Sequence, residues 1–232
     1  DSSMSSLDVI IVAAGSGTRL GLSVPKAFVP LMGKPILSYS LQTFLSHQAI
    51  NSVILVVPDS MYESANRDYA GKRVKVTTGG EHRWQSVSRG IDISDAEWVM
   101  IHDAARPFVS NMVIDRLLAM KPKYDCVITV TPEVDTIRMY SGDQAGETVD
   151  RDKLVRVGTP QMFRKETLCQ GLIRAKSLPT PPTDEAILMQ QMGVKVGIAW
   201  GDPRNFKITT PSDLEIAEAL IARSQQMSLG GQ

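Results

Sequence analysis

The sequence predicts an α/β protein, a Rossmann-like three-layer sandwich with a mostly parallel central sheet. Continuous apolar runs at residues 9–14 and 52–57 indicate strands that are buried on both faces, as parallel strands are. These runs alternate with segments of helical periodicity, which crossover connections between parallel strands require. The chain has 232 residues, of which 43% are hydrophobic, so it can form one sizeable core. We therefore expect a single domain over residues 1–232.

The individual elements follow from local patterns along the chain. Pro35 opens the first helix, because a proline in the first turn loses no hydrogen bond. Ser110 is predicted as a helix N-cap, and Thr183 as the N-cap of a later helix with an acidic first turn. The predicted strands are residues 9–14, 52–57, 74–77, 98–101, 126–130 and 195–200. The predicted helices are residues 36–44, 61–69, 111–120 and 165–177, with others ending at residue 91 and beginning at residues 183 and 210.

The last predicted helix is amphipathic, and its pattern places Ile216 and Ala217 toward the core. From residue 224 onward the chain is largely polar, and two glycines precede the last residue. We therefore expect the final residues to fray.

Residues 133–157 interrupt the alternation of strands and helices. Side chains alternate in character over residues 134–140, and a Ser-Gly-Asp turn follows at residues 141–143. This pattern predicts two antiparallel strands. They are too short to form a core of their own. We therefore predict a protruding antiparallel β-arm that packs against a second subunit, and hence a homodimer.

Composition excludes several classes of partner. Lys and Arg together number 25, as do Asp and Glu, so bulk charge indicates neither nucleic acid nor an acidic membrane as a partner. No apolar stretch approaches the roughly 20 residues of a membrane span. Cys126 and Cys169 have no metal-site spacing and are expected to be reduced thiols. We expect a cytoplasmic protein, or one of the plastid stroma if a transit segment has been removed.

The first strand leads directly into a glycine loop. Gly15 and Gly17 follow the apolar run, and two cations, Arg19 and Lys26, come next. Glycines let backbone N–H groups approach phosphate oxygens closely, and cations pair with those oxygens. A dinucleotide fingerprint would have a third glycine where Leu20 stands, and a Walker loop would continue in Gly-Lys-Ser or Gly-Lys-Thr. The remaining pattern resembles that of nucleotidyltransferases that activate sugar or polyol phosphates.

Two further strand ends carry polar groups. A second glycine loop at residues 79–80 runs into a helix that contains Ser86, which suits a tight turn or a nucleotide site. Asp103 and Arg106 follow the strand at residues 98–101, where open α/β sheets bind ligands. His102 is more typical of a hydrogen-bonded core histidine than of a base or metal ligand.

Taken together, these motifs closely resemble the 2-C-methyl-D-erythritol 4-phosphate cytidylyltransferase family of the non-mevalonate isoprenoid pathway. The resemblance covers roughly residues 7–222. It rests on nine segments in register: Ala13-Ala-Gly-Ser-Gly-Thr-Arg19, Pro25-Lys26, Gly79-Gly80 with Arg83 and Ser86, His102-Asp-Ala-Ala-Arg-Pro107, Asp135-Thr136, Thr148-Val-Asp-Arg151, Thr159-Pro-Gln161, Thr183-Asp-Glu185, and Asn205 with Lys207 and Thr209.

The resemblance implies that CTP and methylerythritol phosphate react to give a CDP-alcohol and pyrophosphate, with Mg²⁺ or another divalent cation. It assigns catalysis to Arg19, Lys26 and Lys207, which would stabilise the reacting α-phosphate. By matching motifs, the nucleotide-binding residues are Ala13, Ala14, Gly15, Ser16, Gly17, Gly80, Glu81, Ser86, Asp103 and Ala104. The residues that would bind the polyol phosphate are Asp103, Arg106, Thr136, Arg151, Thr159, Thr183 and Lys207, with Arg151 reaching the site of the neighbouring subunit.

Two positions depart from the family pattern. Family members often carry aspartate at the position of Glu81 and an aromatic residue near Val155. Two other functions remain open at this point. Ribitol-5-phosphate cytidylyltransferases share the fold and the glycine loop, although Ala105 and the run ending at Arg151 favour methylerythritol phosphate. A non-catalytic nucleotide-binding module is the second alternative, and the cations Arg19, Lys26 and Lys207 argue against it.

Overall fold

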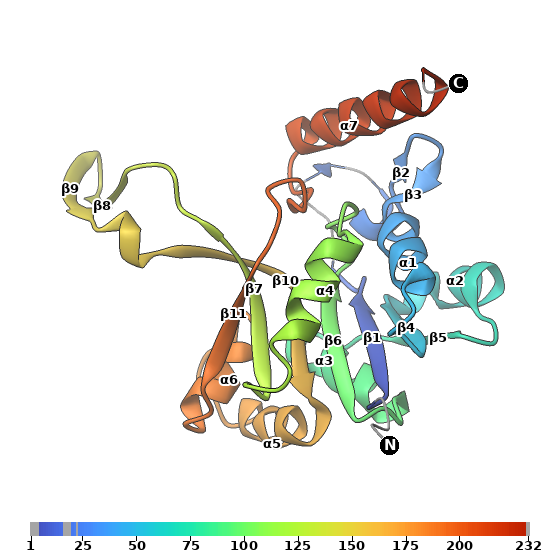
Figure 1. The fold of residues 1–232 in the computed structure, drawn as a ribbon, viewed down its shortest axis with the longest axis horizontal. Helices are drawn as coiled ribbons and strands as arrows, with labels where there is room; N and C mark the ends of the chain where they lie inside the picture. Colours follow the sequence, from blue (N-terminus) through green and yellow to red (C-terminus); the bar gives the residue numbers. More distant parts are fainter. Residues whose placement is uncertain (1–4, 16–19, 22, 231–232) are drawn as a thin grey trace.

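The computed structural model describes residues 5–15, 20–21 and 23–230, and it is built around a seven-stranded sheet (Figure 1). The strand order is β11-β7-β10-β6-β1-β4-β5. Its strands are β1 (Leu7–Val12), β4 (Ser52–Val57), β5 (Val74–Thr78), β6 (Trp98–Asp103), β7 (Cys126–Pro132), β10 (Val155–Arg164) and β11 (Val196–Trp200). All neighbouring pairs are parallel except those of β10, which runs antiparallel to β6 and β7. The predicted α/β fold with a mostly parallel sheet is confirmed.

Strand β10 was not predicted as a strand, because two features hide it in the sequence. Pro160 lies in its middle and has no N–H to donate to a neighbouring strand. The pairing of β10 with β7 shifts register between Gly158 and Gln161, so the pattern of alternating side chains is broken.

Helices cover both faces of the sheet and give the three predicted layers (Figure 1). Alternate side chains of each strand point to opposite faces, so Val9 and Ile11 pack on one side of β1 and Ile10 on the other. The first side is covered by α1 (Ile36–Ser46), α2 (Tyr62–Tyr69) and α4 (Asn111–Ala119). The second side is covered by α3 (Arg83–Ile93), α5 (Lys165–Ala175) and α6 (Ala186–Gln191). Short elements complete this part of the chain: η2 (Lys26–Phe28), β2 (Pro30–Leu31), β3 (Lys34–Pro35) and η3 (Asp59–Met61).

Helix α6 begins later than predicted. Its first residue is Ala186, and the backbone N–H of Ile187 donates to the carboxylate of Asp184 at 3.1 Å. The prediction that Thr183 is the N-cap was therefore wrong. Asp184 supplies the side-chain cap instead, because its carboxylate accepts from one of the free N–H groups of the first turn.

The C-terminal helix α7 (Pro211–Leu229) packs on a small apolar cluster apart from the main core. Asp213 accepts hydrogen bonds from the backbone N–H groups of Thr209 and Thr210 at 2.8 and 3.0 Å, which caps the start of the helix. Ala217 is buried as predicted, but Ile216 is 53% exposed. The helix also continues past residue 224, so the expected frayed end is helical as far as Leu229.

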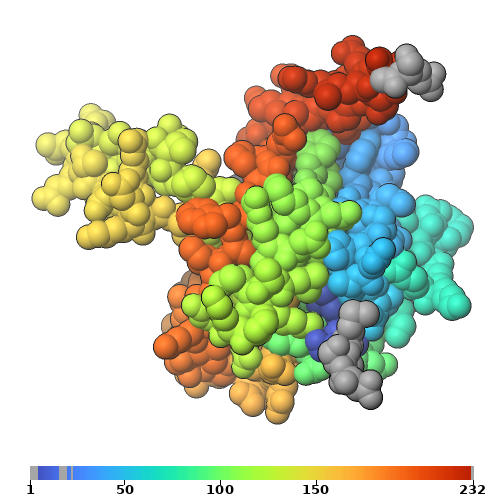
Figure 2. All heavy atoms as spheres, viewed as in Figure 1, coloured from blue at the N-terminus to red at the C-terminus, as the bar shows by residue number. Residues whose placement is uncertain are grey.

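A β-hairpin extends away from the sheet (Figures 1 and 2). It consists of β8 (Ile137–Ser141) and β9 (Gln144–Val149), which pair antiparallel around a turn at Gly142, and η4 (Arg151–Lys153) follows. Met139 and Tyr140 on this hairpin are 63% and 82% exposed. The hairpin lies within residues 133–157, and its role as a dimerisation arm stays a prediction. No helix in the described part of the chain is long and apolar enough to cross a membrane.

Candidate active site

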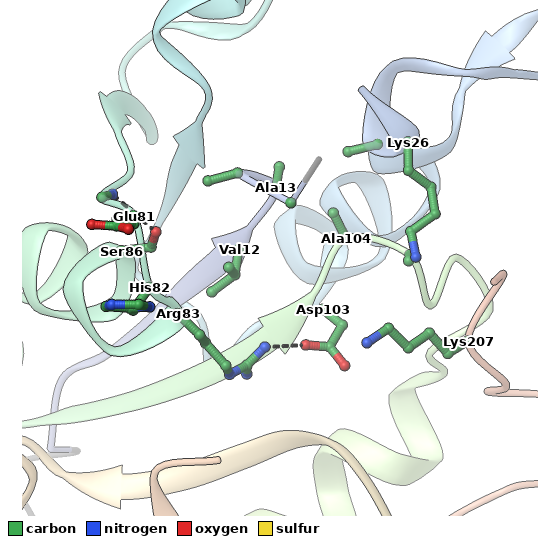
Figure 3. Close-up of a pocket in the computed structure, with 15 residues that line it drawn as sticks. Val12, Ala13, Lys26, Glu81, His82, Arg83, Ser86, Asp103, Ala104 and Lys207 are labelled. Atoms are coloured by element: carbon green, nitrogen blue, oxygen red, sulfur yellow. Dashed lines mark hydrogen bonds and ion pairs between the residues drawn. The ribbon is translucent and has the colours of Figure 1, made fainter. Parts of the chain in front are cut away.

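The carboxyl ends of β1 and β6 open into a cleft of about 280 Å³ (Figure 3). The chain leaves β1 for β4 on one side and later returns to β6 on the other side of β1. Open α/β sheets bind ligands where the strand order reverses in this way, because the loops on the two sides diverge. The residues that line the cleft are Val12, Ala13, Ala14, Gly15, Lys26, Ala27, Gly80, Glu81, His82, Arg83, Ser86, Asp103, Ala104, Ala105 and Lys207.

The two glycine loops meet at one end of the cleft. A side chain at Gly79 would place its Cβ only 2.4 Å from the Cβ of Ala14 and 2.6 Å from the hydroxyl of Ser86. Only glycine fits here. The backbone N–H of Gly80 donates to the Ser86 hydroxyl at 3.2 Å, and that of His82 donates to the Gln85 side chain at 2.8 Å. The second loop is thus held against the first, with Glu81 and Ser86 at the same end (Figure 3).

The opposite end of the cleft contains a chain of ion pairs between two buried carboxylates and two half-buried arginines. Arg83 lies between two carboxylates: its Nη1 donates to Asp103 Oδ1 at 2.6 Å and its Nε to Glu185 Oε1 at 3.0 Å. The second oxygen of Asp103, Oδ2, accepts from Nε of Arg106 at 3.2 Å. Arg106 also donates through Nη1 to the carbonyl of Asn205 at 3.0 Å. Both oxygens of Asp103 are therefore bound by guanidinium groups.

These contacts keep Asp103 ionised. Burial alone would raise the pKa of its carboxyl, but the charges of Arg83, Lys207 and Arg106 lower that pKa well below its usual range. Glu185 behaves differently, because burial raises its pKa more strongly than Arg83 lowers it. Asp103 is thus a permanent negative charge at the end of β6.

His102 lies beneath this network and is fully buried. The backbone N–H of Asp103 donates to the hydroxyl of Thr159, which lies 3.0 Å from Nδ1 of His102. Nε2 of His102 lies 3.0 Å from the carbonyl of Arg106 and donates to it. Nδ1 is therefore the acceptor of the Thr159 hydroxyl in the neutral ring. Burial lowers the pKa of His102 to about 4, so His102 is the hydrogen-bonded core histidine that the sequence predicts.

Lys26 and Lys207 bring two amino groups to the same end of the cleft. Lys26 belongs to η2, and Lys207 follows β11 in the loop before α7. Figure 3 shows both amino groups pointing into the space beside Ala104 and Asp103. Two cations that are 181 positions apart in the sequence numbering (207 minus 26) thus face one volume. An anion in this volume would be attracted by both.

Most of the predicted site residues meet in two adjoining clefts. Those in the cleft described above are Ala13, Ala14, Gly15, Lys26, Gly80, Glu81, Ser86, Asp103, Ala104 and Lys207. A neighbouring cleft shares Asp103 and Lys207 with it and adds Arg106, Thr159 and Thr183.

The remaining predicted residues lie elsewhere. Ser16, Gly17 and Arg19 fall outside the described residues. Thr136 and Arg151 are exposed residues of the arm and line neither cleft of their own chain. Arg151 donates to the carbonyl of Val134 at 2.8 Å, which fixes the base of the arm.

The sequence places Arg83 and Glu185 in the family motifs but predicts no role in the site for either of them. Arg83 is the first residue of α3, where the helix dipole disfavours a cation, so its position was a signal for a separate role. The sequence predicts Glu185 as an acidic residue in the first turn of the helix after Thr183, but its side chain turns inward and is only 1% exposed. Nothing in the local sequence links it to Arg83.

The described residues contain no group of three or more His, Cys, Asp or Glu side chains that could hold a metal ion. Two carboxylates, Asp103 and Glu81, line the first cleft. Mg²⁺ needs oxygen ligands and keeps several waters, so phosphate oxygens and water can complete its coordination. The donor set therefore fits a divalent cation that is bound mainly through a substrate, with at most one or two protein ligands.

The chain is similar to known proteins of one family. A family model described as 2-C-methyl-D-erythritol 4-phosphate cytidylyltransferase matches residues 7–223. The chain belongs to this family. The family that the sequence predicts is thereby confirmed, and its members are nucleotidyltransferases.

Individual family members are similar over nearly the whole chain. The cytidylyltransferase of Deinococcus radiodurans is 41% identical over 91% of this chain and 88% of its own. That of Halalkalibacterium halodurans is 36% identical over 94% of this chain and 98% of its own. The crystal structure of the Thermus thermophilus cytidylyltransferase has a TM-score of 0.79 at 30% identity, covering 93% and 98% of the two chains. That of 4-diphosphocytidyl-2C-methyl-D-erythritol synthase from Anaerococcus prevotii has a TM-score of 0.81 at 27% identity, covering 95% and 100%.

The buried histidine predicts a pH dependence of stability. His102 has a folded-state pKa of about 4, below its ordinary 6.5, so its contribution to stability is complete above pH 6.5 and is lost as pH falls toward 4. We expect this one group to remove roughly 3 kcal/mol of unfolding free energy between pH 7 and pH 4. Urea denaturation of the wild type and of His102→Asn across this range measures the difference. Parallel pH profiles for the two proteins would contradict the assignment.

Proposed function

We propose that this chain transfers CMP from CTP to 2-C-methyl-D-erythritol 4-phosphate and releases pyrophosphate, as a step of isoprenoid biosynthesis by the non-mevalonate pathway. Family membership supports the reaction. The observation that carries the assignment to this cleft is the meeting of two glycine loops at one end with Lys26 and Lys207 at the other. One end suits a nucleoside and the other suits phosphates.

The nucleotide binds along the first cleft. We assign residues 13–17 to the binding of the triphosphate, and Gly80, Glu81 and Ser86 to that of the cytidine. The Ser86 hydroxyl accepts from the Gly80 N–H, so its own proton remains to be donated to the nucleotide. Gly79 lies so close to Ala14 that the two loops are in contact, and this contact sets the width of the nucleoside end of the cleft.

The reaction needs no general base. The attacking group is an oxygen of the acceptor phosphate, whose second pKa lies near 6, so it is already mostly anionic at neutral pH. This oxygen forms a bond to the α-phosphorus of CTP while the bond from that phosphorus to the bridging oxygen breaks, and pyrophosphate leaves with the electron pair. His102 is buried, neutral and bound on both ring nitrogens, so it takes no part in proton transfer.

Catalysis consists mainly of bringing two anions together and stabilising the charge of the transition state. Lys26 and Lys207 supply positive charge at the phosphate end of the cleft, and we assign the same task to Arg19. Ion pairs hold Asp103 and Arg106 in place, so the site has little to reorganise when the substrates bind.

The adjoining cleft receives the polyol phosphate. Arg106, Thr183 and Lys207 face it, with Asp103 at the boundary between the two clefts. Thr159 acts differently from a direct ligand. Its hydroxyl accepts from the Asp103 N–H and pairs with His102, so it fixes the backbone that carries Asp103.

A divalent cation, Mg²⁺ in the simplest case, would supply further positive charge to the triphosphate. Because guanidinium groups hold both oxygens of Asp103, phosphate oxygens and water would supply most of its ligands. The arm completes the site of a second subunit in a homodimer, to which it contributes Thr136 and Arg151. The absence of a nucleic acid or membrane partner and a cytoplasmic location remain predictions of the composition.

The reaction itself is tested by measuring pyrophosphate release from CTP with three acceptors. We expect release with methylerythritol phosphate, far slower release with ribitol 5-phosphate, and none above background without an acceptor. Faster turnover with ribitol 5-phosphate would reverse the choice of substrate. Binding of CTP without release in any mixture would favour a nucleotide-binding module instead.

Lys26 tests the electrostatic mechanism. Removal of its charge in Lys26→Ala should lower kcat by about 10²–10³, the usual scale for the loss of one preorganised electrostatic stabiliser. Lys72→Ala is the matched control, because Lys72 is an exposed lysine in the loop before β5. Near-normal turnover of a folded Lys26→Ala protein would remove this residue from the catalytic role.

Subunit mixing tests the arm. If Arg151 serves the neighbouring subunit, a heterodimer of Arg151→Ala and Lys26→Ala chains has one site with both residues intact. We expect such mixed dimers to regain about half of the wild-type activity per dimer, whereas each parent remains poorly active. Mixed dimers of verified composition that show no gain over their parents would place Arg151 in the site of its own chain.

A further inference from the structure

Lys207 lies beside a buried carboxylate without forming an ion pair with it. Its amino group points toward Asp103 in Figure 3, yet in the described part of the chain no carboxylate is within ion-pair distance of Lys207. Both oxygens of Asp103 are instead bound by arginines, Oδ1 by Arg83 at 2.6 Å and Oδ2 by Arg106 at 3.2 Å.

The binding of both Asp103 oxygens by arginines affects which anion Lys207 can pair with. An ammonium group on a flexible stem pairs readily with a neighbouring carboxylate, and it would do so here if an oxygen of Asp103 were open. Two bound guanidinium groups turn the local charge from negative to positive, since one carboxylate is surrounded by two cations. Lys207 still acts on Asp103 through its charge, but it makes no ion pair with either oxygen, so its amino group can bind an incoming phosphate.

Arg83 can saturate Asp103 only because something holds it there. It is half-buried at the first residue of α3, where the helix dipole opposes a positive charge. Glu185 binds the other edge of the same guanidinium, with Oε1 at 3.0 Å from Nε. The planar fork is thereby fixed with Nη1 toward Asp103.

Stability alone does not explain the presence of Glu185. It is 1% exposed, and its second oxygen, Oε2, has no hydrogen-bond partner among the described residues. Burying a carboxylate with an unsatisfied oxygen costs free energy. A buried ion pair, such as that of Glu185 with Arg83, is often no more stabilising than apolar side chains of the same volume.

We propose that Glu185 is a positioning residue for catalysis: by fixing Arg83 on Asp103, it prevents Asp103 from capturing Lys207 and leaves this lysine for the substrate phosphate. The catalytic part of this inference rests on the proposed function. The arrangement around Lys207 does not, because it concerns only groups of the protein.

A double-mutant cycle separates this role from a structural one. Glu185→Ala should lower kcat/KM for methylerythritol phosphate about 10- to 100-fold in the wild type, but less than about 2-fold in a Lys207→Ala background, because the lysine it protects is gone. A purely structural role for Glu185 predicts the same fold loss in both backgrounds, and that result would overturn the proposal. Glu97→Ala is the control, because Glu97 pairs with Arg164 at 3.0 Å just before β6, at the opposite end of that strand from the cleft.

A second measurement does not depend on turnover. Competitive acetylation with acetic anhydride, followed by mass spectrometry, reports how reactive Lys207 is relative to the exposed Lys72 in the same protein. Capture by Asp103 should make Lys207 react several-fold more slowly in Glu185→Ala than in the wild type. An unchanged ratio would overturn the proposal even if the enzyme proves active on the expected substrates.

Glu185→Gln guards against loss of folding. The amide keeps the shape and an acceptor for Arg83 but lacks the charge. We therefore expect kcat/KM and the reactivity of Lys207 to lie between the values of the wild type and those of Glu185→Ala. Circular dichroism and urea denaturation verify that each variant is folded. Wild-type reactivity and kinetics in a folded Glu185→Gln protein would show that the charge of Glu185 is not needed.

Discussion

The active site depends on one buried negative charge at the end of β6. A site for a nucleoside triphosphate and a phosphate monoester needs several cations close together, and such cations repel one another in the absence of substrate. Asp103 and Glu185 lie among Arg83, Arg106 and Lys207 and compensate most of this repulsion. The cluster keeps a net positive charge, to which Lys26 adds. The protein can therefore hold a positively charged site open before any substrate arrives, which is the preorganisation that the proposed mechanism requires.

The sequence allowed the fold to be predicted where local patterns and final structure agree. Long apolar runs marked the parallel strands, because burial on both faces demands them. β10 was hidden by Pro160 and by its register shift. The cap of α6 was misplaced by one residue, since three consecutive polar residues can each cap a helix and only the backbone decides among them. Ile216 was expected inside, yet α7 rests on a small cluster and leaves most of its surface in solvent.

The site was predictable to the extent that it follows strand ends. Glycine loops and charges after β1, β5 and β6 were recognisable because the carboxyl ends of parallel strands gather at one edge. The pairing of Arg83 with Glu185 joins residues 102 positions apart and has no local signature. Arg151 shows the opposite limit. Its motif was visible, but the two clefts described above do not include it, and its contact with the substrate of a neighbouring subunit stays a prediction.

The placement of β10 has a mechanical consequence. This strand starts at the base of the arm and, without an intervening loop, passes Gly158 against the guanidinium of Arg106 and then Thr159 under Asp103. Strands in a sheet are stiff along their length, so a displacement of the arm is transmitted along the backbone rather than absorbed by a flexible linker. A partner that binds the arm and displaces it would therefore also act on the hydrogen bond between Thr159 and the backbone of Asp103.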